Sequence, residues 1–470
     1  MRKTKIICTI GPASSKVETL EKMCLAGMNV ARLNFSHGTH ETHLETINNI
    51  KNVRKKLGLP IGIMLDTKGP EYRIGCFKDG KAVVEDGKLF TFTAGDVEGD
   101  ETRVSVSYKD LAKDLSVGDR VLVNNGLLIF EVEEIQGSDV VCRVVAGGVI
   151  SNRKSMSFPN KVLKQDYLSE QDKKDIAFGI AQEVDFIACS FVSCAQDLRD
   201  VKALLKEIGG EDVSLIAKIE NQSGIDNIES ICEECDGIMI GRGDMGVEIP
   251  FEKLPVIQKQ LITKCRMLGK RVITATEMLE SMIHNPRPTR AEISDVANAV
   301  YDGSSAIMLS GETAAGKYPV LTVETMAKIA AETEKNIRYE KRFFGYDFRI
   351  NNKLDAISHS VCNMSIDLNA KAVVVCSLSG TTARMVSRFR SPVDIIGLSV
   401  REKTWRQLSL SWGVTPLLCE EYPSAEVLFY TAKRIAKKAF DLKTGDTIII
   451  TGGTTTGESG NTNTIRIETV

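Results

Sequence analysis

Long hydrophobic runs and a charge imbalance are both missing from this sequence. No apolar run approaches the roughly 20 residues that a membrane-spanning helix needs. The formal net charge is only −2 over 470 residues, so the chain offers no basic field for nucleic acid or for an anionic membrane. We therefore expect neither nucleic acid nor a membrane among its partners.

Paired cysteines and clustered metal ligands are also scarce. The 12 cysteines are scattered and follow no secretory leader, which favours free thiols in a reducing compartment and predicts a cytoplasmic protein. Cys232 and Cys235 form a C-x-x-C pair on a predicted helix, but without a second pair a structural role is favoured. His37, His40 and His43 cannot all face one ion on a helix, so we predict a helix start and a solvated face there.

The length of the chain allows two or three domains. The chain also contains a repeated unit. Short apolar runs that end in polar residues or glycine alternate with amphipathic helical stretches. There are eight such runs: Lys5–Thr9, Asn29–Leu33, Ile61–Leu65, Phe186–Ser190, Leu215–Ile219, Gly237–Ile240, Arg271–Thr276 and Ala306–Leu309. Eight strand and helix units in order predict a closed (β/α)₈ TIM barrel, residues 1–69 and 170–340, with its active site at the carboxyl ends of the strands.

Residues 70–169 interrupt this rhythm. Their apolar residues alternate or are β-branched, with Asp-Gly and Gly-Asp turn signals between the runs, at Leu89–Thr93, Arg103–Ser107, Arg120–Val123, Leu127–Glu133 and Val140–Val145. The pattern predicts a small β-barrel domain inserted into the larger barrel. Because its connections near Pro70 and Pro159 leave the rim of the site, we expect it to act as a lid.

The pattern restarts after Tyr339. Residues 341–470 alternate predicted helices at Leu354–Leu368, Thr382–Phe389, Thr404–Leu410 and Ala425–Phe440 with predicted strands at Lys371–Cys376, Asp394–Ser399, Thr415–Cys419, Thr447–Thr451 and Thr464–Glu468. We predict a separate three-layer α/β domain.

One loop of this C-terminal domain is rich in hydroxyl groups. Residues 377–382 read Ser-Leu-Ser-Gly-Thr-Thr and lead from a predicted strand into a helix. Their backbone N–H groups and hydroxyls are suited to holding a phosphate group. A capped helix with no ligand is an equally good interpretation of this loop alone.

Lys218, Glu220 and Asp244 stand where two successive predicted strands end. A helical stretch joins these strands, so the strands are parallel and their ends face one space. Two carboxylates beside one lysine are costly to bury unless a cation joins them. Mg²⁺ accepts one or two carboxylates and leaves its other positions to water and phosphate. The sequence predicts a Mg²⁺ and phosphate centre, against the plainer alternative of an ion pair at a sheet edge.

Two glycine motifs point to other ligands, and each fails on a detail. Gly241–Gly246 matches the dinucleotide-binding pattern G-x-G-x-x-G, but Pro250 follows too closely for a helix to begin on the glycines, and Asp244 would face the pyrophosphate. Residues 311–317 nearly match a P-loop, but Tyr318 replaces the hydroxyl residue that binds Mg²⁺. We reject both interpretations.

Six strings of residues, spread over the whole chain, form one specific set. They are Thr-Lys-Ile-Ile-Cys-Thr-Ile-Gly-Pro (residues 4–12), Ala-Arg-Leu-Asn-Phe-Ser-His-Gly (31–38), Leu-Asp-Thr-Lys-Gly-Pro-Glu (65–71), Ala-Lys-Ile-Glu-Asn-Gln (217–222), Arg-Gly-Asp-Met-Gly-Val-Glu (242–248) and Asn-Pro-Arg-Pro-Thr-Arg-Ala-Glu (285–292). Together they resemble the pyruvate kinase family. That family transfers the phosphoryl group of phosphoenolpyruvate to ADP, giving pyruvate and ATP in the final step of glycolysis, and its barrel, lid and C-terminal domain follow the same order.

The resemblance implies a role for each matching residue. Glu220 and Asp244 resemble the ligands of Mg²⁺ (or Mn²⁺), and Lys218 resembles the residue that steadies charge on the phosphoryl group and the enolate. Arg32 resembles the arginine that reaches the phosphoryl group, and Thr276 the threonine near the delivered proton. The implied phosphoenolpyruvate site comprises Arg32, Ser190, Lys218, Gly243, Asp244 and Thr276, the backbone of Gly243 and Asp244 forming the carboxylate cradle.

Further ligands follow from the same resemblance. It implies K⁺ as a second cofactor, bound by oxygens suited to a hard cation on Asn34, Ser36, Asp66 and Thr67. The implied ADP/ATP site comprises Pro12, Asn34, His37, Arg73 and Lys154, with Lys154 reaching over from the lid. The loop residues Ser377, Ser379, Gly380, Thr381 and Thr382 would bind a phosphorylated allosteric effector, with fructose 1,6-bisphosphate as first candidate and AMP or a ribose phosphate as alternative. Family members are typically homotetramers, so we expect a homotetramer.

Several positions depart from the family pattern. They are Asn124-Asn125 in place of two aspartates, Phe158-Pro-Asn160 in place of Leu-Pro-Gly, Tyr72 in place of an aliphatic residue and Ser193 in place of an arginine. Most lie in or beside the lid, so they bear on lid closure and nucleotide affinity more than on the chemistry. Two other functions stay open: a carbon–carbon lyase that passes through a pyruvate enolate, which has no use for the lid or Lys154, and a silent sensor that binds a sugar phosphate.

Overall fold

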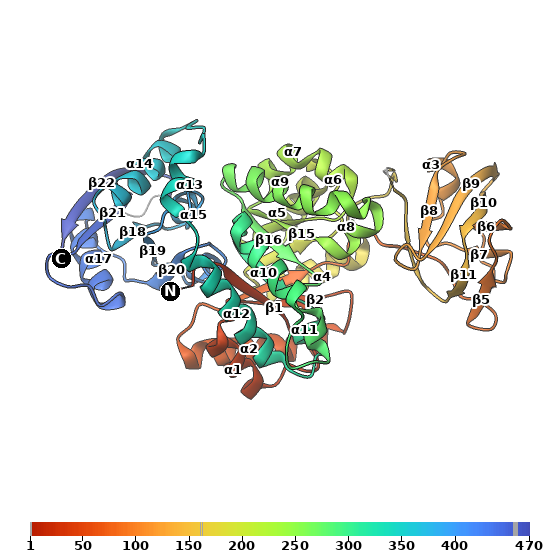
Figure 1. Cartoon of the computed structure of the whole chain (residues 1–470), viewed down its shortest axis with the longest axis horizontal. Coiled ribbons are helices and arrows are strands. Elements are labelled where there is room, and N and C mark those ends of the chain that lie inside the picture. Colours follow the sequence, from red (N-terminus) through yellow and green to blue (C-terminus); the bar gives the residue numbers. More distant parts are fainter. Residues whose placement is uncertain (1, 160, 162, 455–458) are drawn as a thin grey trace.

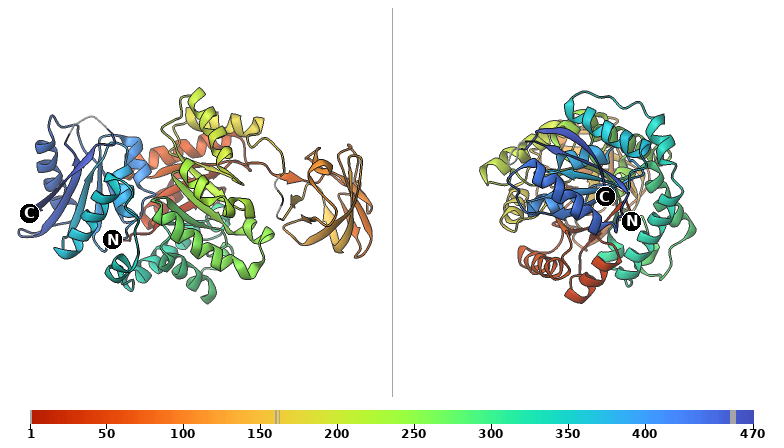
Figure 2. Two further views of the ribbon diagram at one scale, coloured as in Figure 1. Left: turned by 90° about the horizontal axis from the view of Figure 1, so that it is seen from above. Right: turned by 90° about the vertical axis from the view of Figure 1, so that its left-hand side faces the viewer.

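Three bodies lie in a row, with the barrel between the C-terminal domain and the lid (Figure 1). The computed structural model describes residues 2–159, 161, 163–454 and 459–470, and the lid departure at Asn160 lies outside these residues. Figure 2 shows the same row from above, with the lid joined to the barrel by a narrow connection. Each body has its own buried apolar core. The predicted fold class is confirmed, and the domain boundaries at residues 69/70, 169/170 and 340/341 stay a prediction.

The central body is a closed barrel of parallel strands. Its strands are β1 (Lys5–Thr9), β2 (Val30–Asn34), β3 (Gly62–Asp66), β13 (Phe186–Cys189), β14 (Ser214–Ile219), β15 (Gly237–Gly241), β16 (Arg271–Ala275) and β17 (Ala306–Leu309). All eight predicted strands are found to within one residue at either end. The interior is filled by apolar side chains such as Met64, Phe186 and Met239, and Leu410 of the C-terminal domain joins this cluster.

Helices cover the outside of the barrel. They are α1 (Val17–Ala26), α2 (His40–Leu57), α4 (Glu170–Ala181), α5 (Ala195–Glu207), α6 (Gln222–Asp226), α7 (Ile228–Glu234), α8 (Arg242–Glu248), α9 (Leu254–Met267), α10 (Arg290–Asp302), α11 (Gly311–Ala314) and α12 (Pro319–Lys335), with 3₁₀ turns η1 (Phe251–Lys253) and η2 (Glu280–Ile283). Sequence signals set their ends: Thr39 and Thr289 form capping boxes, and Gly58 ends α2 in the left-handed conformation.

The lid is a small β structure that closes on itself. It contains β4 (Tyr72–Arg73), β5 (Lys81–Val84), β6 (Leu89–Thr93), β7 (Arg103–Ser105), α3 (Leu111–Asp114), β8 (Arg120–Val123), β9 (Leu128–Gln136), β10 (Asp139–Ala146), β11 (Gly148–Ser151) and β12 (Ser155–Ser157). Seven strands form one sheet in the order β4-β12-β8-β9-β10-β6-β7, and a bridge between Ile74 and Val106 joins its two edges. The runs predicted from the sequence include β7 and β8 but not β4, β5, β11 and β12.

The C-terminal domain has the predicted three layers. Its elements are α13 (Tyr339–Gly345), α14 (Lys353–Asp367), β18 (Ala372–Cys376), α15 (Thr381–Ser387), β19 (Asp394–Ser399), α16 (Glu402–Leu408), β20 (Val414–Leu418), α17 (Ala425–Ala439), β21 (Thr447–Gly453) and β22 (Thr462–Thr469). The sheet order is β20-β19-β18-β21-β22. Residues of α14, α15 and α16 pack in one core with the sheet, and residues of α17 pack in the other.

Two local expectations were wrong. A helix does begin on the glycine motif: α8 starts at Arg242, directly after Gly241, and its seven residues end before Pro250. His40 begins α2 as predicted, but its ring is not on a solvated face. It stacks on Phe178 at 4.4 Å, and its Nε2 lies 2.6 Å from Asp175 Oδ1. Local spacing alone could reveal neither a helix this short nor this tertiary contact.

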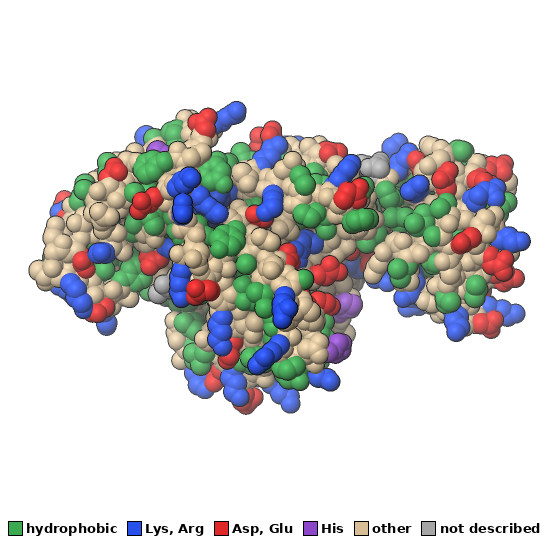
Figure 3. Space-filling view, viewed as in Figure 1, with side chains coloured by type: hydrophobic (Ala, Val, Ile, Leu, Met, Phe, Trp, Pro, Cys, Tyr) green, Lys and Arg blue, Asp and Glu red, His purple; other side chains and the backbone are tan. Residues whose placement is uncertain are grey.

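The distribution of charged side chains on the surface agrees with the near-zero net charge of the sequence. Acidic and basic side chains are mixed over the face of the molecule in Figure 3, in line with the formal net charge of −2. In the part of the chain that the structure describes, no helix is long and apolar enough to cross a membrane. All 12 cysteines are free thiols, as predicted.

Candidate active site

Lys218 forms one group of four with three side chains from neighbouring strand ends. Its Nζ lies 3.0 Å from Asp66 Oδ1, 2.6 Å from Ser190 Oγ and 3.2 Å from Glu220 Oε1. The four come from the carboxyl ends of β3, β13 and β14, where the barrel fold brings polar residues together. The side chain of Lys218 is 11% exposed. The predicted convergence of Lys218 with a strand-end carboxylate is therefore present, with Asp66 as an additional partner.

Arg32 reaches the same group from β2. Its Nε lies 2.6 Å from Asp66 Oδ2, and its Nη1 donates to Thr9 Oγ1 at 2.8 Å. Asp66 is fully buried between two cations. Burial alone would raise the pKa of Asp66, but the charges of Arg32 and Lys218 outweigh burial and lower it. Asp66 therefore stays ionised and fixes both cations at the rim.

Glu220 and Asp244 form a carboxylate pair whose negative charge is only partly balanced, by Lys218 beside Glu220. Glu220 is 2% exposed, and its Oε2 accepts the Phe191 N–H at 2.9 Å. Burial, together with the charge of Asp244, raises the pKa of Glu220 to about 7 against the opposing charge of Lys218. Gly241 permits this packing, because a Cβ there would lie 2.6 Å from Glu220 Oε1. This donor set fits a hard divalent cation.

Thr276 and Gly243 contact each other across the ends of β15 and β16. The Gly243 N–H donates to Thr276 Oγ1 at 2.9 Å, so this amide, expected in the carboxylate cradle, has a partner within the protein. Thr276 has a positive φ of 69°, an unusual backbone state for a β-branched residue and one that marks functional sites. Buried Arg242, which sequence analysis did not single out, binds the Thr276 carbonyl and Asp295. Its only sequence signal is its place beside Asp244.

Ser190 also has hydrogen-bond partners other than Lys218. Its carbonyl accepts the hydroxyl of Tyr167 at 2.7 Å, and its own hydroxyl donates to the Thr67 carbonyl at 2.6 Å. Tyr167 was not predicted as a site residue, because it lies near the end of the segment predicted as the lid and belongs to no motif. The contact orients the hydroxyl that faces Lys218.

The four residues assigned to K⁺ lie on adjacent strand ends. Asn34 pairs with Asp66 in the β2–β3 register, and Asn34 Oδ1 accepts the Ser36 N–H at 3.1 Å. The Thr67 carbonyl follows directly on β3. All are oxygen donors, and those other than Asp66 are neutral, which suits a monovalent hard cation.

A cleft of about 530 Å³ separates the barrel rim from the lid. Its lining includes Glu71, Arg73 and Lys154 on the lid side and Asp244 on the barrel side. Arg73 binds Glu71 Oε1 at 2.5 Å, and Lys68 lies 3.7 Å from the same carboxylate. The other predicted nucleotide residues, Pro12, Asn34 and His37, lie beyond this lining at the ends of β1 and β2.

The lid departures have local explanations. Asn124 and Asn125 have φ of 55° and 56° in the turn after β8, a left-handed state that asparagine tolerates well. The next residue of this turn, Gly126, lies against Val247 of α8. Tyr72 packs edge-on against Phe158 with ring centroids 5.5 Å apart. These departures build the lid side of the cleft.

Ser193 lies on the barrel side of the same cleft. Its N–H donates to Asp197 Oδ2 at 2.7 Å, and its hydroxyl accepts Asn221 Nδ2 at 3.0 Å. The uncharged Ser193 leaves this wall of the cleft without the positive charge that the family pattern has there.

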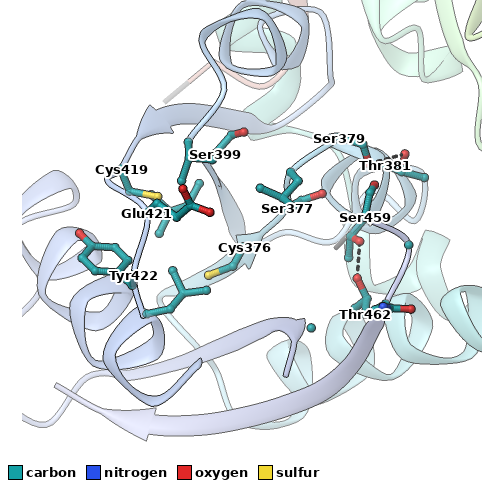
Figure 4. A pocket seen from close by; sticks show the side chains of 18 of the residues that line it. Cys376, Ser377, Ser379, Thr381, Ser399, Cys419, Glu421, Tyr422, Ser459 and Thr462 are labelled. Carbon is teal, nitrogen blue, oxygen red and sulfur yellow. Dashed lines mark hydrogen bonds between the residues drawn. The ribbon is translucent and has the colours of Figure 1, made fainter. Parts of the chain in front are cut away.

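A second cavity, of about 170 Å³, lies in the C-terminal domain beside the predicted effector loop. The Gly380 N–H donates to Ser377 Oγ at 3.0 Å, and Thr382 Oγ1 lies 2.6 Å from Thr462 Oγ1. Gly380 has a φ of 75°, which glycine adopts at no cost. Figure 4 shows Ser377, Ser379 and Thr381 on one side of this cavity and Glu421 and Tyr422 on the other. In its described lining there is no lysine or arginine.

Comparisons with known proteins match most of the chain, and two family models match separate parts of it. The family model described as pyruvate kinase, barrel domain, matches residues 1–323, and that described as pyruvate kinase, alpha/beta domain, matches residues 355–468. A pyruvate kinase of Clostridium acetobutylicum is 44% identical over 474 positions and covers 100% of both chains. One of Staphylococcus epidermidis is 47% identical, covering 100% of this chain and 81% of its own. A crystal structure of a pyruvate kinase from Cryptosporidium parvum has a TM-score of 0.95 at 38% identity, covering 100% of this chain and 96% of that one.

Proposed function

Because the chain belongs to the pyruvate kinase family, we propose that the residues around Lys218 carry out the family's reaction. The protein is a phosphotransferase that moves the phosphoryl group of phosphoenolpyruvate to ADP and releases pyruvate and ATP. One observation carries the assignment: Lys218 Nζ lies within 3.2 Å of three polar groups on three strand ends. A cation held this firmly needs no reorganisation when negative charge develops on the transferring group.

Lys218 and Arg32 divide the charge of the substrate. Arg32, anchored on Asp66 at 2.6 Å, binds the phosphoryl group of phosphoenolpyruvate. Lys218 stabilises the negative charge on the phosphoryl group during its transfer and on the enolate oxygen from which the phosphoryl group departs. Because Arg32 and Lys218 are themselves buried, each charge acts through a low dielectric and has a strong effect.

The family is metal-dependent, and Glu220 with Asp244 is the pair that would hold Mg²⁺ or Mn²⁺. Their donor chemistry fits: they are two carboxylates close enough for the charge of Asp244 to act on Glu220, and Glu220 is almost fully buried. When bound, the metal supplies a second positive charge that neutralises phosphoryl oxygens and orients them. The α8 backbone at Gly243 and Asp244 binds the substrate carboxylate, in place of the bond that Gly243 makes to Thr276.

The enolate accepts a proton at carbon to become pyruvate. Thr276 lies at the end of β16, with its hydroxyl 2.6 Å from its neighbour's carbonyl and in contact with Gly243. We assign Thr276 to the path of that proton, and Ser190 to substrate binding beside Lys218. A second cation, K⁺, would be held by Asn34, Ser36, Asp66 and the Thr67 carbonyl, where it would complete the positive field around the phosphoryl group.

ADP occupies the cleft between the rim and the lid. Arg73 and Lys154 on the lid side supply positive charge to its phosphates, and Pro12, Asn34 and His37 lie on the barrel beyond the lining of the cleft. Closure of the lid would bring these two sets together and exclude water.

The C-terminal cavity binds a phosphorylated effector. Ser377, Ser379, Gly380, Thr381 and Thr382 are the phosphate-binding residues. Family resemblance favours fructose 1,6-bisphosphate, but the opposite wall carries Glu421 and no described lysine or arginine. A second phosphate would have no cationic partner there, which favours a monophosphate such as AMP or a ribose phosphate. Resemblance also supports a cytoplasmic homotetramer.

One assay tests the reaction: pyruvate formation from phosphoenolpyruvate, with and without ADP and with and without Mg²⁺. A phosphotransferase forms pyruvate only when both are present. Pyruvate formation without ADP would mean hydrolysis of phosphoenolpyruvate and would contradict phosphoryl transfer to ADP, and no formation under any condition would favour the lyase or the silent sensor.

A further inference from the structure

The amino-terminal ends of the barrel strands, here called the floor, rest on the C-terminal domain. Asp185 precedes β13 and is fully buried. Its Oδ2 accepts the Ile63 N–H of β3 at 2.9 Å, and its Oδ1 lies 2.7 Å from Arg406 Nε of α16. One carboxylate therefore joins the bases of two strands to a helix of another domain.

Asp236 makes the corresponding joint before β15. Its Oδ2 accepts the Leu215 N–H of β14 at 3.1 Å, and its Oδ1 lies 2.6 Å from Arg384 Nη1 of α15. Its carbonyl accepts the Arg271 N–H at the start of β16 at 3.3 Å. Three strand bases and the C-terminal domain meet at this residue.

The strands tied at the floor are those whose other ends carry the active site. The far ends of β3, β13, β14, β15 and β16 lead to Asp66, Ser190, Lys218 with Glu220, Asp244, and Thr276 respectively. These strands are four to six residues long, so a floor contact lies within about 20 Å of the chemistry along a stiff element. A shift of one strand against its neighbour at the floor displaces a site residue at the rim.

We propose that Arg384 and Arg406 are positioning residues for phosphoryl transfer, which act through Asp236 and Asp185 to hold the site strands in register. Both arginines lie on helices that border the effector loop. Arg384 is in the helix that begins at Thr381, and Thr404 of α16 donates to the Leu378 carbonyl at 2.8 Å. A ligand that moves the loop therefore moves both arginines, and this regulatory part rests on the proposed effector site.

Arg384 gives the cleaner test of the two. The Arg384–Asp236 side chains are 19% and 34% exposed, and ion pairs that reach solvent contribute little to stability. Arg406 and Asp185 are 9% and 0% exposed, so breaking that pair leaves a buried charge and risks unfolding. A change in catalysis in an Arg384 variant can thus be separated from loss of the fold.

The experiment compares Arg384→Gln with Arg384→Lys and with Arg466→Gln. Arg466 forms its ion pairs with Glu426 and Glu468 inside the C-terminal domain, so it is the matched control. The measurements are KM for phosphoenolpyruvate and kcat without effector, Mn²⁺ binding by electron paramagnetic resonance, and the melting temperature. We expect KM and the Mn²⁺ Kd of Arg384→Gln to rise roughly 2- to 30-fold, with partial rescue in Arg384→Lys and no change in Arg466→Gln.

A double-mutant cycle locates the effect. Asp236→Asn is expected to match Arg384→Gln, and the double variant to be no worse than either, because both changes break one contact. The proposal is overturned if Arg384→Gln lowers only the melting temperature while KM and Mn²⁺ binding stay at the wild-type values. Independent, multiplying effects of the two changes would also overturn it.

The basal measurements need no effector, so they stand even if the effector site fails. Where a phosphometabolite does activate the wild type, we expect Arg384→Gln to lose part of that activation. Full activation in the variant would refute the regulatory part.

Discussion

The rim and the floor of the barrel both bury charge, but they balance it differently. At the floor, Asp236 has Arg384 and a backbone N–H as partners, and the arginine lowers its pKa although burial acts in the opposite direction. At the rim, Lys218 is shared between Asp66 and Glu220, and burial with the nearby charge of Asp244 raises the pKa of Glu220 to about 7. A balanced end holds the structure together. An end short of positive charge is ready to take a cation and a phosphate.

The rim and the floor differ only in degree in how far their buried carboxylates are balanced by positive charge. Asp185 at the floor has its pKa raised by burial even though Arg406 lies 2.7 Å away. Its two oxygens are bound by a backbone N–H and a guanidinium, much as those of Glu220 are bound by the Phe191 N–H and by Lys218. The rim differs in its second carboxylate, Asp244, which lines the cleft where a ligand can reach it.

The largest effect is expected at the rim, from Lys218→Met. Turnover should fall at least ~10²-fold, because a fixed positive charge is removed where negative charge develops. Lys403→Met, which breaks the exposed floor pair with Asp212, is the matched control and should keep its turnover. Steady-state kinetics and the melting temperature of both variants decide the matter, and near-normal turnover in Lys218→Met would refute the assignment.

Removal of K⁺ should come next. In a buffer whose only monovalent cation is a bulky organic ion, most of the turnover should be lost and then restored by KCl. Glu71→Lys should lessen this requirement, because it supplies a positive charge near the site. Glu71 already has Arg73 at 2.5 Å and Lys68 at 3.7 Å, so the new lysine would also repel both cations. Full activity of the unmutated protein without K⁺ would contradict the proposed K⁺ site.

The opposite pattern is expected at the floor, from Leu410→Ala. Leu410 is fully buried in the cluster that fills the barrel, and its truncation should cost about 2–5 kcal/mol of unfolding free energy. The folded fraction should keep a turnover much closer to wild type than Lys218→Met does. Denaturant titration and kinetics at low temperature test this, and an unchanged unfolding midpoint would show that the C-terminal domain does not plug the barrel.

The smallest effect is expected in the effector loop. Addition of a phosphometabolite should shift the phosphoenolpyruvate saturation curve about 5-fold or more, and Ser379→Ala with Thr382→Ala should abolish the shift. Ser424→Ala removes an ordinary helix cap of α17 in the same domain and should leave it intact. If fructose 1,6-bisphosphate, AMP and ribose 5-phosphate all fail to move the curve, the loop is only the start of a helix.

Most of the fold could be predicted from the sequence, because the barrel strands are apolar runs with sharp polar ends. The expectation that Glu220 and Asp244 face one space followed from the parallel strands that a helix joins. The floor could not be predicted. Arg384 and Asp236 are 148 residues apart, and a single arginine on a short helix has the same local pattern as a solvated one. Arg242 was missed for the same reason, since its partners lie on the next strand.

We propose that the carboxylates at the rim bind one divalent cation that offsets their excess negative charge. Mn²⁺ titration followed by electron paramagnetic resonance tests this most directly. Since the pKa of Glu220 is raised to about 7, its carboxyl is ionised above that pH and protonated below it, and binding must displace the proton. The account predicts one site in the wild type, roughly ten-fold weaker at pH 6 than at pH 8, and its loss in Glu220→Gln but not in Lys403→Met. Equal Mn²⁺ binding by the wild type and Glu220→Gln would contradict it.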